Sequence, residues 1–336
     1  MIVDIIEKNV LFSLTPHPLQ EKLCDQLNLE PGSLEVRRFP DGESYLRVLT
    51  SVKGANCVIL ADLTHPDTKY LALLFLFETL RELGARSIGL VAPYLCYMRQ
   101  DRRFEEGEAV TSRVFAQSLS LHIDWLITVD PHLHRYQSLD EIYSIPTQVV
   151  QGAPALADWL RGQNGLLLVG PDAESEQWVS SIAQASNHPY VIGTKQRLGD
   201  RRVEVTLPDI SAYNGRKAVI IDDVISSGRT IGECVRALKA QGTKAILCAA
   251  VHGIFAEASD TYLLGTGLQT LVTTNTVPHS SNEIDVSELL DTTENGVSSL
   301  IQPAHVLAWE KTHRKLRFGD VVLFKSGYTD KYYKPF

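Results

Sequence analysis

The stretch Val219–Thr230, VIIDDVISSGRT, decides the fold of this 336-residue chain. Its apolar start, Val219–Ile221, leads into two adjacent carboxylates, Asp222 and Asp223, and a Ser-Ser-Gly turn then precedes the helix-like run IGECVRALKA. This order predicts a strand, an acidic tip, a tight loop and a helix. In an open α/β sheet, ligands bind at the carboxyl ends of the strands, where the following helix presents free backbone N–H groups.

The loop Ser226–Thr230 has the composition of a phosphate site, because its small residues and Gly228 let the backbone approach an anion closely. The two carboxylates before it would repel that phosphate, so they suit sugar hydroxyls or a metal ion instead. Together the two features predict a phosphorylated sugar as the ligand. The alternative is a solvated strand end followed by an ordinary helix cap, since short motifs also occur by chance.

Strand-like and helix-like runs alternate along the chain, which is typical of βαβ units with a mainly parallel sheet. We expect two α/β domains joined near residue 150. The expected strands before and after the opening stretch are Val10–Leu14, Cys57–Asp62, Ser87–Ala92, Asp124–Val129, Leu166–Gly170, Tyr190–Lys195, Lys244–Val251 and Gln269–Thr274.

The composition is that of a globular protein in a reducing compartment. Hydrophobic residues make up 44% of the chain and charged residues 21%, as in soluble domains. The net charge of −8 argues against a general nucleic-acid surface, so anionic ligands would need local basic clusters. The five cysteines are scattered without a CxxC spacing, which favours a cytoplasmic location. The most apolar segment, Tyr70–Phe77, is too short to span a bilayer, so no membrane contact is expected.

Two further segments of the first half carry a charge cluster or a turn signal. In APYLCYMRQDRR, the residues Arg99, Arg102 and Arg103 cluster after an expected strand, and guanidinium groups suit phosphate oxygens. The alternative for this run is a solvated charged loop. In RRFPDGESYLRV, from Arg37 to Val48, the sequence Pro-Asp-Gly predicts the turn of a hairpin.

Histidines follow the next expected strand in DPHLHRYQSLDEIY. Asp130, His132, His134 and Asp140 could together form a metal site. A zinc enzyme is a weak interpretation, because no cysteine or glutamate lies at a spacing such as HExxH.

Charged residues also follow two expected strands of the second half. Asp172 follows the strand Leu166–Gly170 at its carboxyl end. Lys195 and Arg197 are two positions apart, so both point to one side of an extended chain. Such a pair serves either solubility or an anionic ligand.

Taken together, these motifs resemble the ribose-phosphate pyrophosphokinase (phosphoribosyl pyrophosphate synthetase) family, over roughly residues 10–305. The resemblance implies an α/β fold of two similar type I phosphoribosyltransferase-like domains, each a mainly parallel sheet flanked by helices. Residues 1–150 would carry the ATP motifs, residues 151–310 the ribose-5-phosphate loop, and residues 311–336 a basic, aromatic tail.

The family implies the activity and the roles of the residues: transfer of the β,γ-diphosphoryl group of ATP to the 1-hydroxyl of ribose 5-phosphate, with Mg²⁺. The residues implied for ATP are Phe39, Asp41, Glu43, Arg99, Gln100, Asp101, Arg102 and His132, with Asp101 orienting its neighbours. Those implied for ribose 5-phosphate are Arg197, Asp222, Asp223, Ser226, Ser227, Gly228, Arg229 and Thr230. His132 and Asp172 would hold the metal, Lys195 and Arg197 would be catalytic, and His134 would be structural.

The same resemblance implies a homo-oligomer, because the hairpin with Phe39 would reach the ATP of a neighbouring subunit. Arg229 stands where the family usually has glycine, and Glu174 and Glu176 replace glycines and would cap the following helix. The continuation FEEGEAVTS resembles the branch of the family without the phosphate-activated, ADP-inhibited regulatory loop.

Alternatives stay open for the function and for the tail. A phosphoribosyltransferase would share the sugar-phosphate loop, and a non-catalytic regulatory paralogue would bind nucleotide without turnover. The segment Lys311–Phe336 has seven Lys or Arg against two Asp, interleaved with aromatic residues. Nucleic acid is one ligand for such a tail, but docking on the protein's own subunits is the interpretation we favour.

Overall fold

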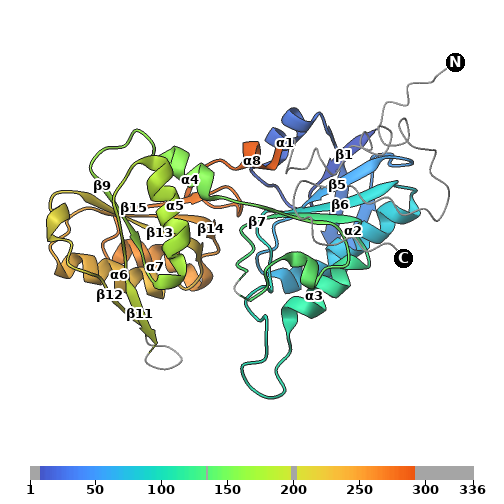
Figure 1. Ribbon diagram of the computed structural model, residues 1–336. Coiled ribbons are helices and arrows are strands. Elements are labelled where there is room, and N and C mark those ends of the chain that lie inside the picture. Colours follow the sequence, from blue (N-terminus) through green and yellow to red (C-terminus); the bar gives the residue numbers. More distant parts are fainter. Residues whose placement is uncertain (1–7, 134, 198–202, 292–336) are drawn as a thin grey trace, which may run out of the picture.

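The computed structural model describes residues 8–133, 135–197 and 203–291, which form two lobes side by side (Figure 1). The first lobe contains β1 (Asn9–Phe12), α1 (Gln20–Leu27), β2 (Glu30–Pro31), β3 (Leu34–Arg38), β4 (Ser44–Val48), β5 (Asn56–Leu60), α2 (Tyr70–Glu82), β6 (Ser87–Ala92), α3 (Thr111–Ser120), β7 (Trp125–Val129) and β8 (Thr147–Val150).

The second lobe contains α4 (Ala153–Leu160), β9 (Leu166–Gly170), α5 (Glu176–Ser186), β10 (Tyr190–Ile192), β11 (Thr194–Arg197), β12 (Val203–Thr206), β13 (Lys217–Ile225), α6 (Arg229–Ala240), β14 (Ile246–Gly253), α7 (Ser259–Gly265), β15 (Thr270–Thr274) and β16 (Asn282–Ile284). The short helix α8 (Ser287–Asp291) then lies against α1 of the first lobe. Among the residues described, no helix is long and apolar enough to cross a membrane.

The first lobe is built on a six-stranded sheet in the order β2-β1-β5-β6-β7-β8, in which every neighbouring pair is parallel. Its central strands β5, β6 and β7 are almost entirely apolar and buried, because helices cover both faces of a parallel sheet. Leu19 and Leu23 bring α1 onto one face, and Phe77 of α2 and Phe115 of α3 pack on the other. The expected parallel α/β fold is therefore confirmed in this lobe.

The second lobe repeats the arrangement with the order β10-β9-β13-β14-β15-β16, again all parallel. In both lobes, an antiparallel hairpin follows the edge strand in the sequence. In the first lobe the hairpin β3–β4 comes between β2 and β5, and in the second the hairpin β11–β12 comes between β10 and β13. The same topology occurs twice, so the expected kinship of the two halves is architectural.

The two lobes share one hydrophobic core. The apolar cluster that contains Ile127 and Val129 of β7 continues through Val150 to Val251 of β14 and Leu156 of α4. Lys22 of α1 adds an ion pair with Asp285 at 2.5 Å. Common packing of this kind fixes the orientation of the two sheets, and with it the distances across the space between them.

The structure corrects two of the expected strands. β13 continues through Asp222 and Asp223 to Ile225, because the long neighbour β14 pairs with it as far as Gly253. The expected strand Tyr190–Lys195 is two strands, β10 and β11, broken at Gly193. A Cβ at Gly193 would lie 2.8 Å from the carbonyl oxygen of Pro171. The chain therefore turns here at a glycine, which has no Cβ.

Candidate active site

Residues of both lobes line one cleft with a volume of about 890 Å³. The first lobe contributes Arg99, Phe104, His132 and Arg135. The second contributes Asp172, Ala173, Glu174, Thr194, Lys195, Asp222 and the loop Val224–Ile231, which includes Ser226, Ser227, Gly228, Arg229 and Thr230. The structure therefore brings together, from motifs far apart in the chain, ten of the residues selected from the sequence: Arg99, His132, Asp172, Lys195, Asp222 and the five of the Ser226–Thr230 loop.

The loop before α6 has the backbone of an anion site. Gly228 is the N-cap of α6 and adopts φ 66°, a left-handed conformation that favours glycine. A Cβ at this position would also lie 3.0 Å from Cγ of Leu263, so the loop packs closely on α7. The Ser259 hydroxyl donates to the carbonyl oxygen of Ser226 at 2.5 Å and holds the loop from the other side. The first N–H groups of a helix have no partner within that helix, so this end of α6 is suited to bind an anion.

The two carboxylates of β13 differ in their surroundings. Asp223 Oδ2 lies 2.6 Å from Nδ1 of His132, a contact between the two lobes. Burial opposes ionisation of Asp223, but the hydrogen bond and the charge of His132 outweigh it and lower the pKa of this carboxyl group. Burial, followed by the charges of Asp223 and Asp172, raises the pKa of Asp222. One ionised and one more readily protonated carboxyl group therefore stand side by side.

Asp172 and Lys195 form an ion pair at the wall of the cleft. Asp172 Oδ1 accepts the backbone N–H groups of Glu174 and Ser175, so this side chain caps the short helix that follows β9. Its second oxygen, Oδ2, accepts from Nζ of Lys195 at 3.0 Å. The capping role expected for Glu174 thus belongs to Asp172, because the shorter side chain reaches the free N–H groups directly. Glu176 is the first residue of α5, and no side-chain hydrogen bond caps this helix at its N-cap, Ser175.

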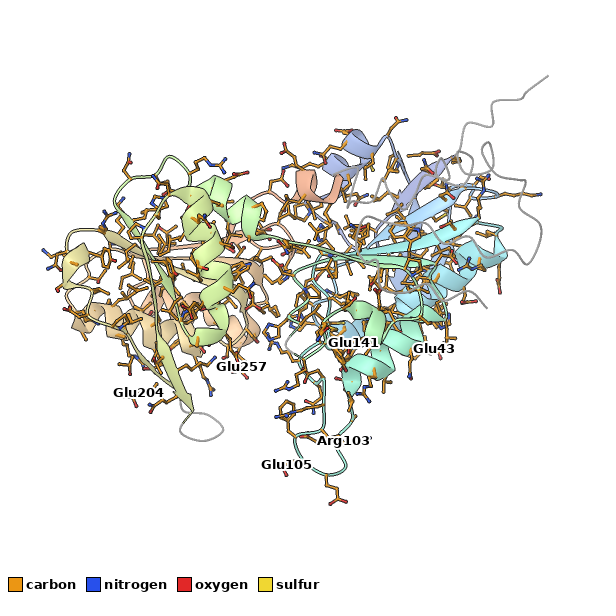
Figure 2. The ribbon with its side chains drawn as sticks, viewed as in Figure 1. Glu43, Arg103, Glu105, Glu141, Glu204 and Glu257 are labelled. Carbon is orange, nitrogen blue, oxygen red and sulfur yellow. The ribbon has the colours of Figure 1, made fainter. Side chains whose placement is uncertain are left out.

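The Arg-rich loop of the first lobe is held by acidic residues. Gln100 donates to Glu108 at 3.0 Å, and the backbone N–H groups of Phe104 and Glu105 also bond Glu108, which lowers the pKa of that carboxyl group. The tip of this loop, with Arg103 and Glu105, projects away from both sheets (Figure 2). Asp101 is buried, and its carboxylate accepts from Nη1 of Arg135 at 2.7 and 2.9 Å.

The hairpin β3–β4 has the predicted turn. Its antiparallel register from Leu34 to Val48 confirms the hairpin, and Gly42 turns at φ 96°. Phe39 is 39% exposed and lies under the guanidinium of Arg37. Phe39, Asp41 and Glu43 are exposed and do not line the cleft of their own chain. Gln100, Asp101 and Arg102 adjoin the cleft without lining it.

A buried histidine that the sequence did not single out joins the two lobes behind the cleft. His252 of β14 lies with Nε2 3.0 Å from the carbonyl oxygen of Val129, and with Nδ1 2.9 Å from the hydroxyl of Thr276. A carbonyl oxygen only accepts, so Nε2 carries the proton. Burial lowers the pKa of His252 to about 4. Burial likewise raises the pKa of Asp130, the residue next to Val129, to about 6.

The structure describes three of the four residues considered as a metal site, and it does not bring Asp130, His132 and Asp140 together as ligands. Asp140 is exposed and accepts from Thr147, Asp130 accepts from the backbone of Gly152, and His134 lies outside the described residues. Within the ranges that the structure describes, no three His, Cys, Asp or Glu side chains converge as a metal-binding group. His132 and Asp172 do line the same cleft. Two such ligands fit an ion that takes its remaining ligands from substrate phosphates and water.

Two more of the expectations lie outside the described residues. They are the side chain of Arg197, whose backbone ends β11, and the tail of residues 311–336. The sequence analysis did not predict three residues of this region: Phe104, Arg135 and His252. Arg135 lies in the segment DPHLHRYQSLDEIY, and a basic residue shortly after a strand end was a signal for it.

Two six-stranded parallel sheets, with two carboxylates and an anion loop at the carboxyl end of the interior strand β13, define a protein of the phosphoribosyltransferase fold. Residues 138–266 match the phosphoribosyl transferase domain, and residues 9–121 match the N-terminal domain of ribose phosphate pyrophosphokinase. The chain is 32% identical over 272 residues to a ribose-phosphate pyrophosphokinase of Methanopyrus kandleri, covering 80% of this chain and 92% of that protein. It is also 32% identical over 282 residues to that of Saccharolobus solfataricus, covering 80% and 94%.

The chain therefore belongs to the ribose-phosphate pyrophosphokinase family. A crystal structure of phosphoribosylpyrophosphate synthetase from Mycobacterium smegmatis has the same fold, with a TM-score of 0.73 over 89% of this chain and 100% of that one, at 22% identity.

Proposed function

We propose that this protein is a ribose-phosphate diphosphokinase. It transfers the β,γ-diphosphoryl group of ATP to the 1-hydroxyl of ribose 5-phosphate and releases AMP. The observation that carries the proposal is the cleft itself, in which a phosphate loop and an acidic strand of one lobe face Arg99 and His132 of the other. Family membership and identities near 30% over most of the chain support the same reaction.

Each part of the reaction has a candidate in this cleft. The loop Ser226–Thr230 binds the 5-phosphate through backbone N–H groups, with Arg229 as an additional cation. Asp222 and Asp223 accept hydrogen bonds from the sugar hydroxyls. Arg99, Gln100 and Arg102 hold the ATP phosphates from the first lobe.

Lys195 is the residue we assign to the chemical step, together with Arg197. Pyrophosphoryl transfer asks the protein for positioning and charge neutralisation and needs no covalent nucleophile. The ammonium group of Lys195 is already oriented by Asp172 at 3.0 Å, so little reorganisation is needed to stabilise the charge on the leaving oxygen of AMP. His132 and Asp172 are the residues that would hold Mg²⁺, which supplies neutralisation of the phosphate charge when bound.

The hairpin residues Phe39, Asp41 and Glu43 belong to a second part of the proposal. They are exposed on this chain and stand apart from its cleft, so we assign them to the adenine and ribose of ATP bound to a neighbouring subunit. The protein then works as a homo-oligomer. Residues 1–150 and 151–310 are the two catalytic domains, and the cytoplasm, where free thiols persist, is the compartment we assign.

The test is AMP release from ATP and Mg²⁺, with and without ribose 5-phosphate, while the phosphorylated sugar product is followed. We expect AMP that depends on the sugar, with no ADP. Binding of ATP without turnover would favour a regulatory paralogue instead. Consumption of phosphoribosyl pyrophosphate together with a nucleobase would favour a phosphoribosyltransferase.

A further inference from the structure

We infer that Arg135 is a further substrate-binding residue, which contacts the β,γ-phosphates of ATP and is held in place by Asp101 and Phe104. This inference deepens the proposed function and rests on it. Arg135 lines the cleft, beside Arg99 and His132 on the first lobe. The loop proposed for the sugar phosphate lines the same cleft from the second lobe.

The bond to Asp101 orients Arg135 without saturating it. Both carboxylate oxygens of Asp101 contact the single nitrogen Nη1, at 2.7 and 2.9 Å. A guanidinium has five N–H donors, so the three on Nε and Nη2 are not used by this carboxylate. The side chain of Asp101 is 3% exposed, and that of Arg135 is 42% exposed. The anchor is therefore buried, while the cationic group it holds stands at the surface of the cleft.

The anchor itself is fixed by a second set of hydrogen bonds. The Tyr136 hydroxyl donates to the carbonyl oxygen of Asp101 at 3.1 Å and lies 3.1 Å from the Ser112 hydroxyl. Ser112 in turn donates to the carbonyl oxygen of Gln100. The backbone beneath the Arg-rich loop is thus tied to the segment that carries Arg135, which reduces the freedom that a ligand would otherwise have to remove.

Phe104 restrains Arg135 from the solvent side. Its ring lines the cleft and lies 5.3 Å from the guanidinium carbon of Arg135 and 5.0 Å from that of Arg102. Cation–π contacts and the planar shape of guanidinium keep such a group oriented at the surface of a cleft. Phe104 is 51% exposed, an unusual position for a large apolar side chain unless it covers a ligand or a cation.

The charge of the cleft makes a further cation useful. Asp172, Glu174 and Asp222 all face a space that has to hold two phosphorylated substrates. Lys195 is already paired with Asp172, and Arg229 stands on the loop for the sugar phosphate. Arg135 is therefore well placed to meet the polyphosphate of ATP from the first lobe.

The experiment compares wild type with Arg135→Lys, because lysine keeps the charge and can still pair with the buried Asp101. Lysine lacks the donors of Nε and Nη2, and arginine and lysine are not equivalent where a planar fork is used. We expect the KM for ATP and the Kd for α,β-methylene-ATP with Mg²⁺ to rise about tenfold, the loss of one charged hydrogen bond. The KM for ribose 5-phosphate and the Kd for AMP should each stay within about twofold of wild type.

The matched control is Arg161→Lys, at the exposed end of α4, where the arginine forms an ion pair with Asp158. It should leave every one of these constants unchanged. Asp101→Asn tests the positioning role. In the wild-type background it should weaken the binding of α,β-methylene-ATP, and in the Arg135→Lys background it should raise the Kd little further, because both changes act through the guanidinium of residue 135.

Unchanged affinity of Arg135→Lys for α,β-methylene-ATP would overturn the inference. An equal loss of affinity for AMP would also overturn it, and so would a loss of affinity confined to ribose 5-phosphate. Either result would mean that Arg135 contacts a group other than the β,γ-phosphates. The Kd for α,β-methylene-ATP is measured without turnover of the substrate. Wild type that binds the analogue but forms no AMP would therefore remove the proposed reaction, while Arg135 would still be judged by its own binding constants.

Discussion

Nδ1 of His132 lies 2.6 Å from the Asp223 carboxylate, so one hydrogen bond joins residues of the two lobes that are 91 positions apart. His132 adopts φ 55°, a left-handed conformation that is uncommon for a residue with a side chain. The backbone strain and the short bond occur at the same residue. This combination indicates that the loop is shaped to present the imidazole to Asp223.

Replacing His132 separates its two ring nitrogens. In His132→Asn the amide nitrogen stands near the position of Nδ1, and in His132→Gln near that of Nε2. We expect kcat to fall about 100-fold or more in the asparagine variant, with the glutamine variant more active, because we assign the proposed role of His132 at the phosphates to the ring nitrogen that does not bond Asp223. Asparagine tolerates the left-handed backbone better, so a more active asparagine variant would show that the bond to Asp223 is the dominant role.

Removing the ammonium group of Lys195 tests the chemical step. We expect Lys195→Ala to lower kcat by about two to three orders of magnitude, with the KM for ribose 5-phosphate changed by less than about threefold. Lys217→Ala, at the exposed start of β13, is the control and should be fully active. Steady-state AMP formation measures both. A Lys195→Ala protein with nearly wild-type kcat would rule out the assigned role.

Gly228→Ala tests the phosphate loop. Alanine at φ 66° is strained and its Cβ would press on Leu263 at 3.0 Å, so the loop has to shift. We expect the KM for ribose 5-phosphate to rise about tenfold or more as backbone hydrogen bonds to the phosphate are lost. Gly242→Ala is the matched control, because it has φ 85° but open space around a new Cβ. Both variants should lose about 1 kcal/mol of stability, but only the first should bind the sugar phosphate poorly.

Stability should depend on pH through His252. Its pKa is lowered to about 4 in the folded protein, so the unfolded chain binds a proton first as the pH falls. Between pH 7 and pH 5 this one residue should cost about 2 kcal/mol of unfolding free energy. His17, with a pKa also lowered to about 4 by burial, acts in the same direction. Asp130 acts oppositely, because its pKa raised to about 6 lets the folded protein take up a proton.

His252→Gln provides the test, since glutamine can donate to Val129 and accept from Thr276 but does not titrate. Urea unfolding of wild type and variant at pH 7 and pH 5 should show that the variant loses about 2 kcal/mol less between the two values. Identical pH slopes would mean that His252 is protonated in the folded protein or is exposed to water.

Much of the fold could be predicted from local sequence. The runs NCVIL, SIGLVA and WLITV are apolar throughout because both faces of a parallel strand are buried. The glycine of the Ser226–Thr230 loop and the turn at Gly42 also follow from local backbone requirements. β13 was predicted too short, since two carboxylates look like a strand end unless the length of the neighbouring strand is known.

The parallel α/β class, the two-fold repetition of architecture and most of the cleft residues follow from local sequence, because strand periodicity, turn chemistry and phosphate motifs are encoded within about a dozen adjacent residues. The residue pairs depend on the tertiary structure: His132 with Asp223, Asp101 with Arg135, and His252 with Val129. These contacts join residues from 34 to 123 positions apart. They depend on the packing that sets the two lobes at a fixed distance, and no local pattern records it.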